Sequence, residues 1–295
     1  MRASAVRTLL LVLAFVGIPA QAEPLPVVAS FSILADMVKV IGTDRVRVRA
    51  LVGPEADAHV YTPTPADARH LRSARLVVIN GMQFEGWIER LIASSGFRGA
   101  LITASDGVVP LYTDDDERSV DPHAWQSLAN ARIYASNIER GLIKADPAGA
   151  EHYRKNAARY REQLSVAELE SRARFGAIPA GARRVITTHD AFAYLGRDFG
   201  IEFIHLLGLS TDSEASAGEL AALIQRIRRE RMRALFLENI TDPRLLQQAA
   251  RDAGVRVGGT LYSDALSAKD GPAATYLDMY LHNVEQLVSA LRPPR

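Results

Sequence analysis

Short β-branched and apolar segments alternate along the chain with longer segments of helical periodicity. In the first half they lie at residues 27–30, 46–52, 76–79 and 101–102, and in the second half at 184–187, 201–204, 234–237 and 255–257. Strands of this length, separated by helices of about 10 to 15 residues, are typical of βα units with parallel pairing. The two sets predict an α/β fold with two lobes, each a mostly parallel sheet flanked by helices.

A long helix is predicted between the two sets, at residues 146–176. Asp146 suits its N-cap and Pro147 its first turn, while Gly176 and Pro179 are typical of residues that end a helix. At roughly 1.5 Å per residue such a helix is about 43 Å long. It can therefore run along both lobes and join them.

Apolar residues recur along this helix at alternating spacings of four and three, which gives a single seam. The seam consists of Tyr153, Ala157, Tyr160, Leu164 and Ala167. It can face the body of the protein, or a second copy in a coiled-coil dimer. Ser171 and Arg174 interrupt it after too few heptads for a coiled coil, so we expect it to pack within one chain and the protein to be a monomer.

The N-terminus has the pattern of a secretory signal peptide. Arg2 and Arg7 precede an apolar run at 9–18, and Ala20 and Ala22 suit a cleavage site. The run is shorter than the roughly 20 apolar residues that span a bilayer. The predicted division of the chain is a signal peptide at 1–22, an N-terminal lobe at 23–145, a linking helix at 146–176 and a C-terminal lobe at 177–295.

Composition is that of an exported globular protein without disulfides. The chain is 48% hydrophobic and 23% charged and contains no cysteine. Without the two arginines of the signal peptide, 33 basic residues (35 − 2) face 34 acidic ones, so the balance is −1 and gives no reason to expect a nucleic-acid partner. Because an exported protein is anchored to lipid through a cysteine, the absence of cysteine predicts a periplasmic protein without a lipid anchor. Any metal site must then be built from histidines and carboxylates.

Four residues that can bind metal stand in turn-rich loops or just after strand-like segments. They are His59, His123, His189 and Asp264, at spacings of 64, 66 and 75 residues. Such spacings are unlike those of a zinc finger, whose ligands cluster within tens of residues. Only a cleft between folded lobes can bring them together. Taken alone, the spacings leave open whether each histidine is a ligand or a structural residue.

Several motifs resemble, in order, those of the zinc- and manganese-binding solute-binding proteins of bacterial metal ABC transporters. They lie at residues 57–67, 71–87, 121–125, 188–194, 208–216, 236–240 and 262–266. The resemblance covers essentially the whole mature chain. It implies two α/β lobes joined by one long backbone helix, with a metal ion in the cleft between the lobes.

The resemblance also implies a ligand set. The ligand histidines of the family's first two motifs fall on His59 and His123, and its Tyr-x-Asp carboxylate falls on Asp264. The third position, which varies between His and Glu in the family, is His189. One departure is Ala58, which stands where the family often has proline.

Three neutral imidazoles and one carboxylate suit Zn²⁺, with Mn²⁺ or Fe²⁺ as less favoured alternatives. We therefore expect a zinc-binding protein that delivers Zn²⁺ to an inner-membrane ABC permease, with a periplasmic metallochaperone as a further candidate partner. Four protein ligands leave no position for an activated water, so no enzyme activity is expected. The alternatives of another class are a secreted metal-dependent hydrolase, with Glu238 as general base, and an adhesin.

The remaining candidates receive structural interpretations. His70, His152, His205 and His282 lie in predicted helices or a strand outside the motifs. Asp121 and Asp190 are candidate acceptors beside ligand histidines, with helix N-capping as the alternative for Asp190. Trp87 and Trp125 are expected to pack the lobes, and Glu238 to make structural hydrogen bonds. The acidic run at 114–117 stands where zinc-binding members of the family often carry a His-rich insertion, and we expect a solvated loop there.

Overall fold

The strands of the protein form two four-stranded parallel sheets in a computed structural model that describes residues 23–112, 119–213, 215–230 and 232–292. Both sheets have the same order: β2-β1-β3-β4 in the first and β6-β5-β7-β8 in the second. The predicted α/β fold with two sheets is confirmed. The predicted signal peptide at 1–22 and the acidic run at 114–117 lie outside the described residues.

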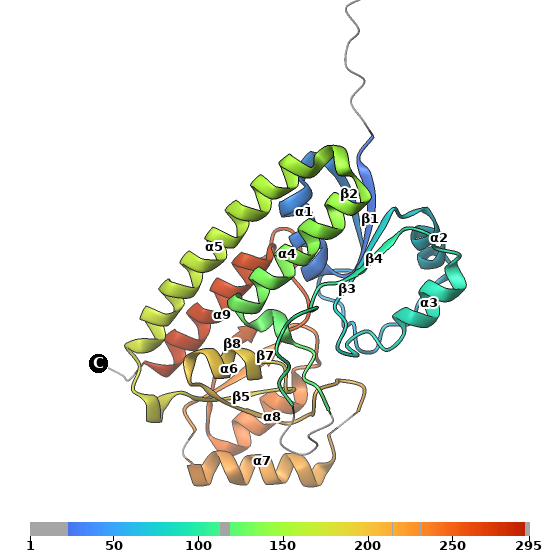
Figure 1. Cartoon of the computed structure of the whole chain (residues 1–295). Helices are drawn as coiled ribbons and strands as arrows, with labels where there is room; N and C mark the ends of the chain where they lie inside the picture. The colour runs from blue at the N-terminus through green and yellow to red at the C-terminus, as the bar shows by residue number, and fades with distance from the viewer. Residues whose placement is uncertain (1–22, 113–118, 214, 231, 293–295) are drawn as a thin grey trace, which may run out of the picture.

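The first sheet has helices on both faces. Its strands are β1 (Leu25–Phe31), β2 (Val46–Val52), β3 (Leu76–Ile79) and β4 (Ala100–Thr103). The helices are α1 (Ser32–Gly42), α2 (Pro65–Ser73), α3 (Ile88–Ser95) and α4 (Leu128–Ala145). Helices α2 and α3 cover one face, and α1 and α4 cover the other (Figure 1).

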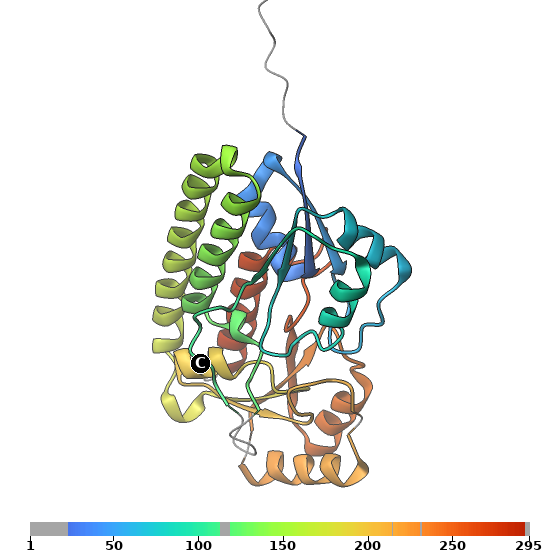
Figure 2. The same cartoon turned by 45° about the vertical axis from the view of Figure 1, so that its right-hand side comes forward.

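The second sheet repeats this arrangement. Its strands are β5 (Arg184–Thr187), β6 (Glu202–His205), β7 (Ala234–Glu238) and β8 (Arg256–Leu261). The helices are α6 (Ala193–Phe199), α7 (Ala217–Glu230), α8 (Arg244–Ala253) and α9 (Tyr276–Leu291). Helix α9 packs against β8 and also continues beside the long helix towards α1 (Figures 1 and 2).

Strand β8 is longer than the sequence predicted. Residues 255–257 were expected to form it, but it continues to Leu261 through Gly258 and Gly259. Glycine is depleted in strands, which is why the expected strand was too short. Here it has a packing role, because a Cβ at Gly258 would lie 2.7 Å from the ring of Phe236 on β7. The extension brings the chain to the loop of Asp264.

The long helix is α5 (Ala150–Gly176), 27 residues that follow a 3-10 turn at Pro147–Gly149. The helical segment begins where the sequence predicted, with Asp146 in the N-cap position and Pro147 in the first turn, but that first turn is 3-10 and the α-helix starts at Ala150. The Asp146 carboxylate accepts hydrogen bonds from the Arg45 guanidinium and, at 2.7 Å, from the Tyr153 hydroxyl.

The apolar seam of α5 packs within the chain. All five predicted seam residues are buried, and the seam continues through Ser171 to Phe175. Ser171 was expected to interrupt the seam; its hydroxyl instead donates to the Ala167 carbonyl at 2.7 Å, so it can be buried without losing a hydrogen bond. Helices α1, α4 and α9 cover this face, and α5 extends past both sheets (Figure 2).

One hydrophobic core extends from the first sheet through α5 to α9, and a smaller one lies between the second sheet and the helices α7 and α8. The division into lobes at 23–145 and 177–295 stays a prediction. In the part of the chain that the structure describes, no helix has the length and apolar character needed to cross a membrane.

Candidate metal centre

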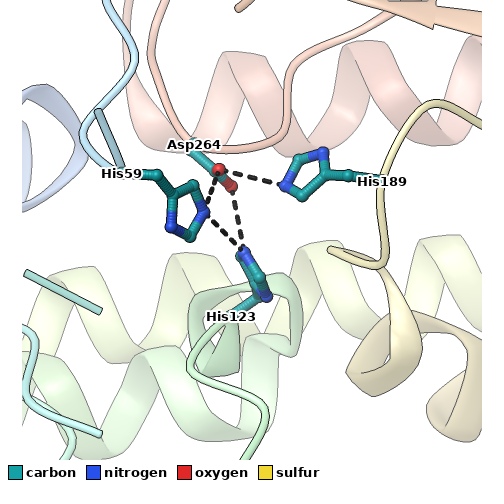
Figure 3. Close-up of side chains that lie close together, drawn as sticks. All are labelled: His59, His123, His189 and Asp264. Atoms are coloured by element: carbon teal, nitrogen blue, oxygen red, sulfur yellow. Dashed lines mark hydrogen bonds and ion pairs between the residues drawn. The ribbon is translucent and has the colours of Figure 1, made fainter. Parts of the chain in front are cut away.

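The carboxyl ends of the two parallel sheets point towards one cleft, and the loops that leave them meet there. His59 follows β2, His123 follows β4, His189 follows β5 and Asp264 follows β8. Their side chains converge from both lobes (Figure 3). The structure therefore brings together the four residues that the sequence analysis selected.

The candidate ligand atoms are close enough to surround one ion. Asp264 Oδ2 lies 3.2 Å from Nε2 of both His59 and His189, and Asp264 Oδ1 lies 3.7 Å from His123 Nε2. The Nε2 atoms of His59 and His123 are 3.4 Å apart, and one ligand atom from each residue lies within 4.8 Å of all the others. Tetrahedral bonds of about 2.0 to 2.1 Å place ligand atoms roughly 3.3 Å from one another.

The Asp264 carboxylate is buried and only partly satisfied. Its side chain is 0% exposed, and Oδ1 has no hydrogen-bond partner among the described residues. Burial alone would raise the pKa of Asp264, but the neighbouring His123 and His189 outweigh burial and lower it. A buried carboxylate that stays ionised favours a cation beside it.

His123 is oriented by Asp121. The Oδ1 atom of Asp121 accepts from the backbone N–H of His123 at 2.9 Å and lies 2.8 Å from its Nδ1. Nε2 therefore faces the cleft and can act as a ligand. The Tyr194 hydroxyl, from the other lobe, donates to the Asp121 carbonyl at 3.1 Å. The predicted role of Asp121 as an acceptor is confirmed.

Glu238 performs the same task for His189. Its Oε1 accepts from the backbone N–H groups of Thr188 and His189 at 2.7 and 2.9 Å, and its Oε2 lies 2.6 Å from His189 Nδ1. Burial opposes protonation of His189, but Glu238 and Asp264 outweigh it and hold the pKa of His189 well above its usual range. Oε1 of Glu238 accepts two backbone hydrogen bonds and Oε2 is paired with the imidazole of His189, so the predicted structural role of Glu238 is confirmed.

The turn that carries His59 is fixed without the family's proline. The carboxylate of Asp57 accepts from the backbone N–H of His59 at 2.8 Å. The carbonyl of the buried Ala58 accepts from Trp87 Nε1 at 2.9 Å, and this bond ties the turn to the residue directly before α3.

A capping box ends the loop of His59. Thr64 is the N-cap of α2, Pro65 begins the helix, and Asp67 Oδ2 accepts from the backbone N–H of Thr64 at 2.7 Å. The Tyr61 hydroxyl donates to the same oxygen of Asp67 at 2.8 Å. The polar residues of this motif thus fix where the loop ends, which limits the positions His59 can take.

His59 is the residue of the four that reaches the surface. Its side chain is 6% exposed, whereas those of His123, His189 and Asp264 are 0% exposed. A cavity of about 360 Å³ lies against it, lined by residues of both lobes that include Met82, Phe84, Leu209 and Asp212. This cavity gives an ion a route to the candidate ligands.

Phe84 belongs to the site, although the sequence analysis gave it no role. Its ring packs edge-on against His59 at 4.8 Å and lies 5.9 Å from His123. It follows a tight turn in which Met82 and Gln83 both have positive φ. The Asn80-Gly81 pair after β3 signals a turn, but no spacing rule connects an apolar residue after a turn with a metal site.

The other histidines lie outside the cluster. His70 is in α2, His152 in α5, His205 at the end of β6 and His282 in α9, as the sequence analysis expected.

Asp190 was interpreted wrongly. It does not cap α6, whose N-cap is Phe192, and its carboxylate lies 3.5 Å from His205 Nε2 rather than on a ligand histidine. Trp87 and Trp125 pack in the core as predicted, and both also donate hydrogen bonds to backbone carbonyls.

Comparison with known proteins places the chain in a family. Residues 27–290 match the model of the ZnuA family, described as zinc-uptake complex component A, periplasmic. The chain belongs to this family. It is thus a periplasmic metal-binding component of metal import by an ABC transporter, which works with an inner-membrane permease. The family is one of transport proteins, not of enzymes.

Relatives within this family are named for different metals. The iron-binding protein YfeA of Yersinia pestis is 32% identical over 267 residues, which cover 90% of this chain and 86% of YfeA. The manganese-binding lipoprotein MntA of Bacillus subtilis is 32% identical over 277 residues, covering 92% and 90% of the two chains. The structure of the periplasmic zinc-binding protein TroA of Treponema pallidum superposes with a TM-score of 0.87 at 28% identity, covering 92% of this chain and 100% of TroA. Family membership therefore does not decide which metal this chain carries.

Proposed function

We propose that His59, His123, His189 and Asp264 bind the transported ion and that this ion is Zn²⁺. The observation that carries the proposal is the buried Asp264 carboxylate. Its Oδ1 has no hydrogen-bond partner among the described residues, and three imidazole Nε2 atoms lie 3.2 to 3.7 Å from one or the other of the two carboxylate oxygens. One cation in this position would satisfy the carboxylate and all three imidazoles.

The donor set favours zinc over manganese. Neutral imidazole suits a borderline ion such as Zn²⁺, whereas Mn²⁺ prefers more oxygen ligands and a higher coordination number. One feature supports the alternative of manganese or iron. The two oxygens of Asp264 face different histidines, so the carboxylate can bind through both and raise the coordination number to five. Zinc also accepts five ligands, and the three nitrogens keep it the preferred ion.

The proposed route of the ion runs from the periplasm, through the cavity beside His59, into the cleft, and from there to the permease. The sequence contains no cysteine to which a lipid could be attached. In this it differs from relatives such as MntA, which is named a lipoprotein. We also propose that it works as a monomer, since α5 buries its apolar seam against α1, α4 and α9 of the same chain.

Metal analysis of protein purified without added metal, followed by competitive titration of Zn²⁺ and Mn²⁺, tests the proposal. We expect zinc to co-purify and to outcompete manganese. His189→Ala should weaken zinc binding at least 100-fold, and His189→Glu should shift the preference towards manganese. His205→Ala is the matched control, because His205 is an exposed histidine outside the cluster. Equal affinity for the two metals would overturn the zinc assignment, and full zinc binding by His189→Ala would overturn the ligand set.

A further inference from the structure

Glu55 lies in the loop that carries His59, and it makes three hydrogen bonds to the other lobe. Its backbone N–H donates to the Leu266 carbonyl at 2.9 Å. Its Oε1 accepts from the backbone N–H of Ala268 at 3.2 Å, and its Oε2 accepts from Asn239 Nδ2 at 3.0 Å. An exposed residue of the first lobe is thus bonded to two separate segments of the second.

The partners of Glu55 adjoin residues that build the metal centre. Leu266 and Ala268 follow Asp264 in the same loop, and Asn239 directly follows Glu238, which holds His189. Glu55 itself stands four residues before His59. A single side chain therefore connects the loops that position three of the four proposed ligands.

The backbone conformation of Glu55 indicates that its side chain is needed. Its φ is +57°, in the left-handed region that favours glycine and that other residues adopt at a cost in strain. Glycine would relieve that strain, but it would lose both bonds of the carboxylate. A second contact supports this part of the loop, since the Thr211 hydroxyl donates to the carboxylate of Asp57 across the lobes.

We propose that Glu55 is a latch: a positioning residue that holds the cleft closed around the ion and limits the rate at which the ion leaves. This inference rests on the proposed metal site. The carboxylate of Glu55 lies at the surface, so water or a docking partner can replace its two bonds without unfolding either lobe. Opening the latch frees the His59 loop to separate from the Asp264 loop.

Dissociation kinetics of Zn²⁺ into an excess of chelator test the latch. Glu55→Gly removes the carboxylate while accepting the positive φ, so the variant should fold. We expect about tenfold faster dissociation, the scale of roughly 1.4 kcal/mol for the two lost hydrogen bonds, with little change in the association rate. Glu162→Ala, which removes an exposed carboxylate from α5, is the control and should dissociate like the wild type. An unchanged dissociation rate in Glu55→Gly would overturn the latch.

A pair of substitutions that swaps donor and acceptor between Glu55 and Asn239 distinguishes a latch from a general structural role. Asn239→Asp opposes two carboxylates at the 3.0 Å contact and should speed dissociation beyond the rate of Glu55→Gly. Adding Glu55→Gln restores a donor facing an acceptor and should slow dissociation again. If Glu55→Gln does not slow dissociation in the Asn239→Asp background, the contact does not control release.

Hydrogen exchange in the metal-free protein separates failure of the latch from failure of the metal site. The Ala268 amide donates to Glu55 and should exchange faster in Glu55→Gly, whether or not the proposed ligands bind metal. Suppose that exchange is faster in Glu55→Gly but that His59→Ala binds zinc like the wild type. The contact of Glu55 would then be supported, and the proposed ligand set would be overturned. If Glu55→Gly changes neither the exchange of the Ala268 amide nor the dissociation of zinc, the latch is overturned while the proposed ligand set stands.

Discussion

Trp125 Nε1 donates a hydrogen bond of 2.9 Å to the carbonyl oxygen of Ser263, the residue directly before Asp264. Gln126 Nε2 donates to the same oxygen at 2.8 Å, and the Tyr276 hydroxyl donates to the Trp125 carbonyl. The turn that follows His123 in one lobe is therefore bonded to the loop of Asp264 in the other. These bonds fix the positions of His123 and Asp264 relative to each other before an ion binds, which lowers the entropic cost of binding.

Trp125→Phe removes this donor while keeping an aromatic ring in the core. We expect a loss of about 1 to 3 kcal/mol in the free energy of unfolding, because a buried hydrogen bond and part of the ring volume are lost. Zinc should also stabilise the variant less than the wild type, since the His123 and Asp264 loops are no longer fixed together. Thermal unfolding with and without zinc measures both effects.

Tyr153→Phe is the control for this prediction. It removes the hydroxyl that donates to Asp146 at the start of α5, far from the cleft. It should lower stability without changing the gain in melting temperature that zinc produces. An equal zinc-induced gain in Trp125→Phe and the wild type would contradict the role given to the Trp125–Ser263 bond.

The sequence was sufficient to locate the sheets and the proposed ligands. The sheets follow a local rule, because β-branched runs predict strands, and parallel strands place a site at their carboxyl ends. Residues 46–52, 76–79 and 184–187 were predicted with the bounds that β2, β3 and β5 have. The four proposed ligands were selected by their resemblance to family motifs in loops after these strands.

The contacts between the lobes could not be predicted in the same way. Glu55 meets Asn239 across 184 positions of sequence, and Trp125 meets Ser263 across 138. The acceptor of the second contact is a backbone carbonyl, which every residue has, so residue type carries no signal for it. Such contacts depend on how two lobes dock, which periodicity within one element does not describe.

Zinc affinity should rise with pH up to pH 7 to 8. An ordinary imidazole would lose zinc below about pH 6. Burial opposes the charge on His189, but Glu238 and Asp264 raise its pKa well above that range, so it keeps its proton in the metal-free protein at neutral pH. The ion must displace this proton. Calorimetry at pH 7 in buffers of different ionisation enthalpy should detect proton release, and fewer protons should be released in His189→Ala.

The raised pKa of His189 also determines how the stability of the metal-free protein changes with pH. A raised pKa stabilises the fold while the group is protonated in both states, below about pH 6.5, and this contribution is lost as the pH rises through the folded-state pKa of His189. Stabilisation of the protein by zinc should therefore grow from pH 6 to pH 8. A flat zinc affinity across this range would exclude a protonated His189.

Glu238→Gln should weaken zinc binding without unfolding the protein. The glutamine Oε1 can still accept from Thr188 and His189, but its amide N–H₂ group would face Nδ1 of His189 in place of Oε2. The Nδ1–H form of the imidazole, which leaves Nε2 free for the ion, then loses its acceptor. We expect a loss of about 10- to 100-fold in zinc affinity, as is usual for residues that orient metal ligands.

Circular dichroism checks that Glu238→Gln keeps its fold, and competitive titration gives its affinity. Glu170→Gln, an exposed change on α5, should bind zinc like the wild type. Wild-type affinity in Glu238→Gln would show that Nδ1 of His189 does not need a carboxylate.

Asp36 should make the metal-free protein less stable as the pH rises from about 4 to 6. It lies on α1, and its Oδ2 accepts from the backbone N–H of Tyr276 at the start of α9, 2.8 Å away. Burial raises the pKa of Asp36 to about 6, although the Tyr276 N–H lowers it in part. A carboxyl whose pKa is raised in the folded state destabilises the fold once it ionises. A rise in pKa from 3.8 to about 6 corresponds to a loss of about 3 kcal/mol in the free energy of unfolding above pH 6.

Asp36→Asn removes the ionisation and keeps an oxygen that can accept from Tyr276. Near pH 4 the aspartate is largely protonated when folded, so the two proteins should unfold at similar denaturant concentrations. The variant should then gain stability over the wild type as the pH rises, by up to about 3 kcal/mol at pH 7.5. Both proteins share every other titrating group, so the difference between their unfolding free energies isolates Asp36. A difference that stays constant from pH 4 to pH 7.5 would mean that folding does not raise the pKa of Asp36, and that its contact with the N-terminus of α9 offsets the cost of burying the carboxylate.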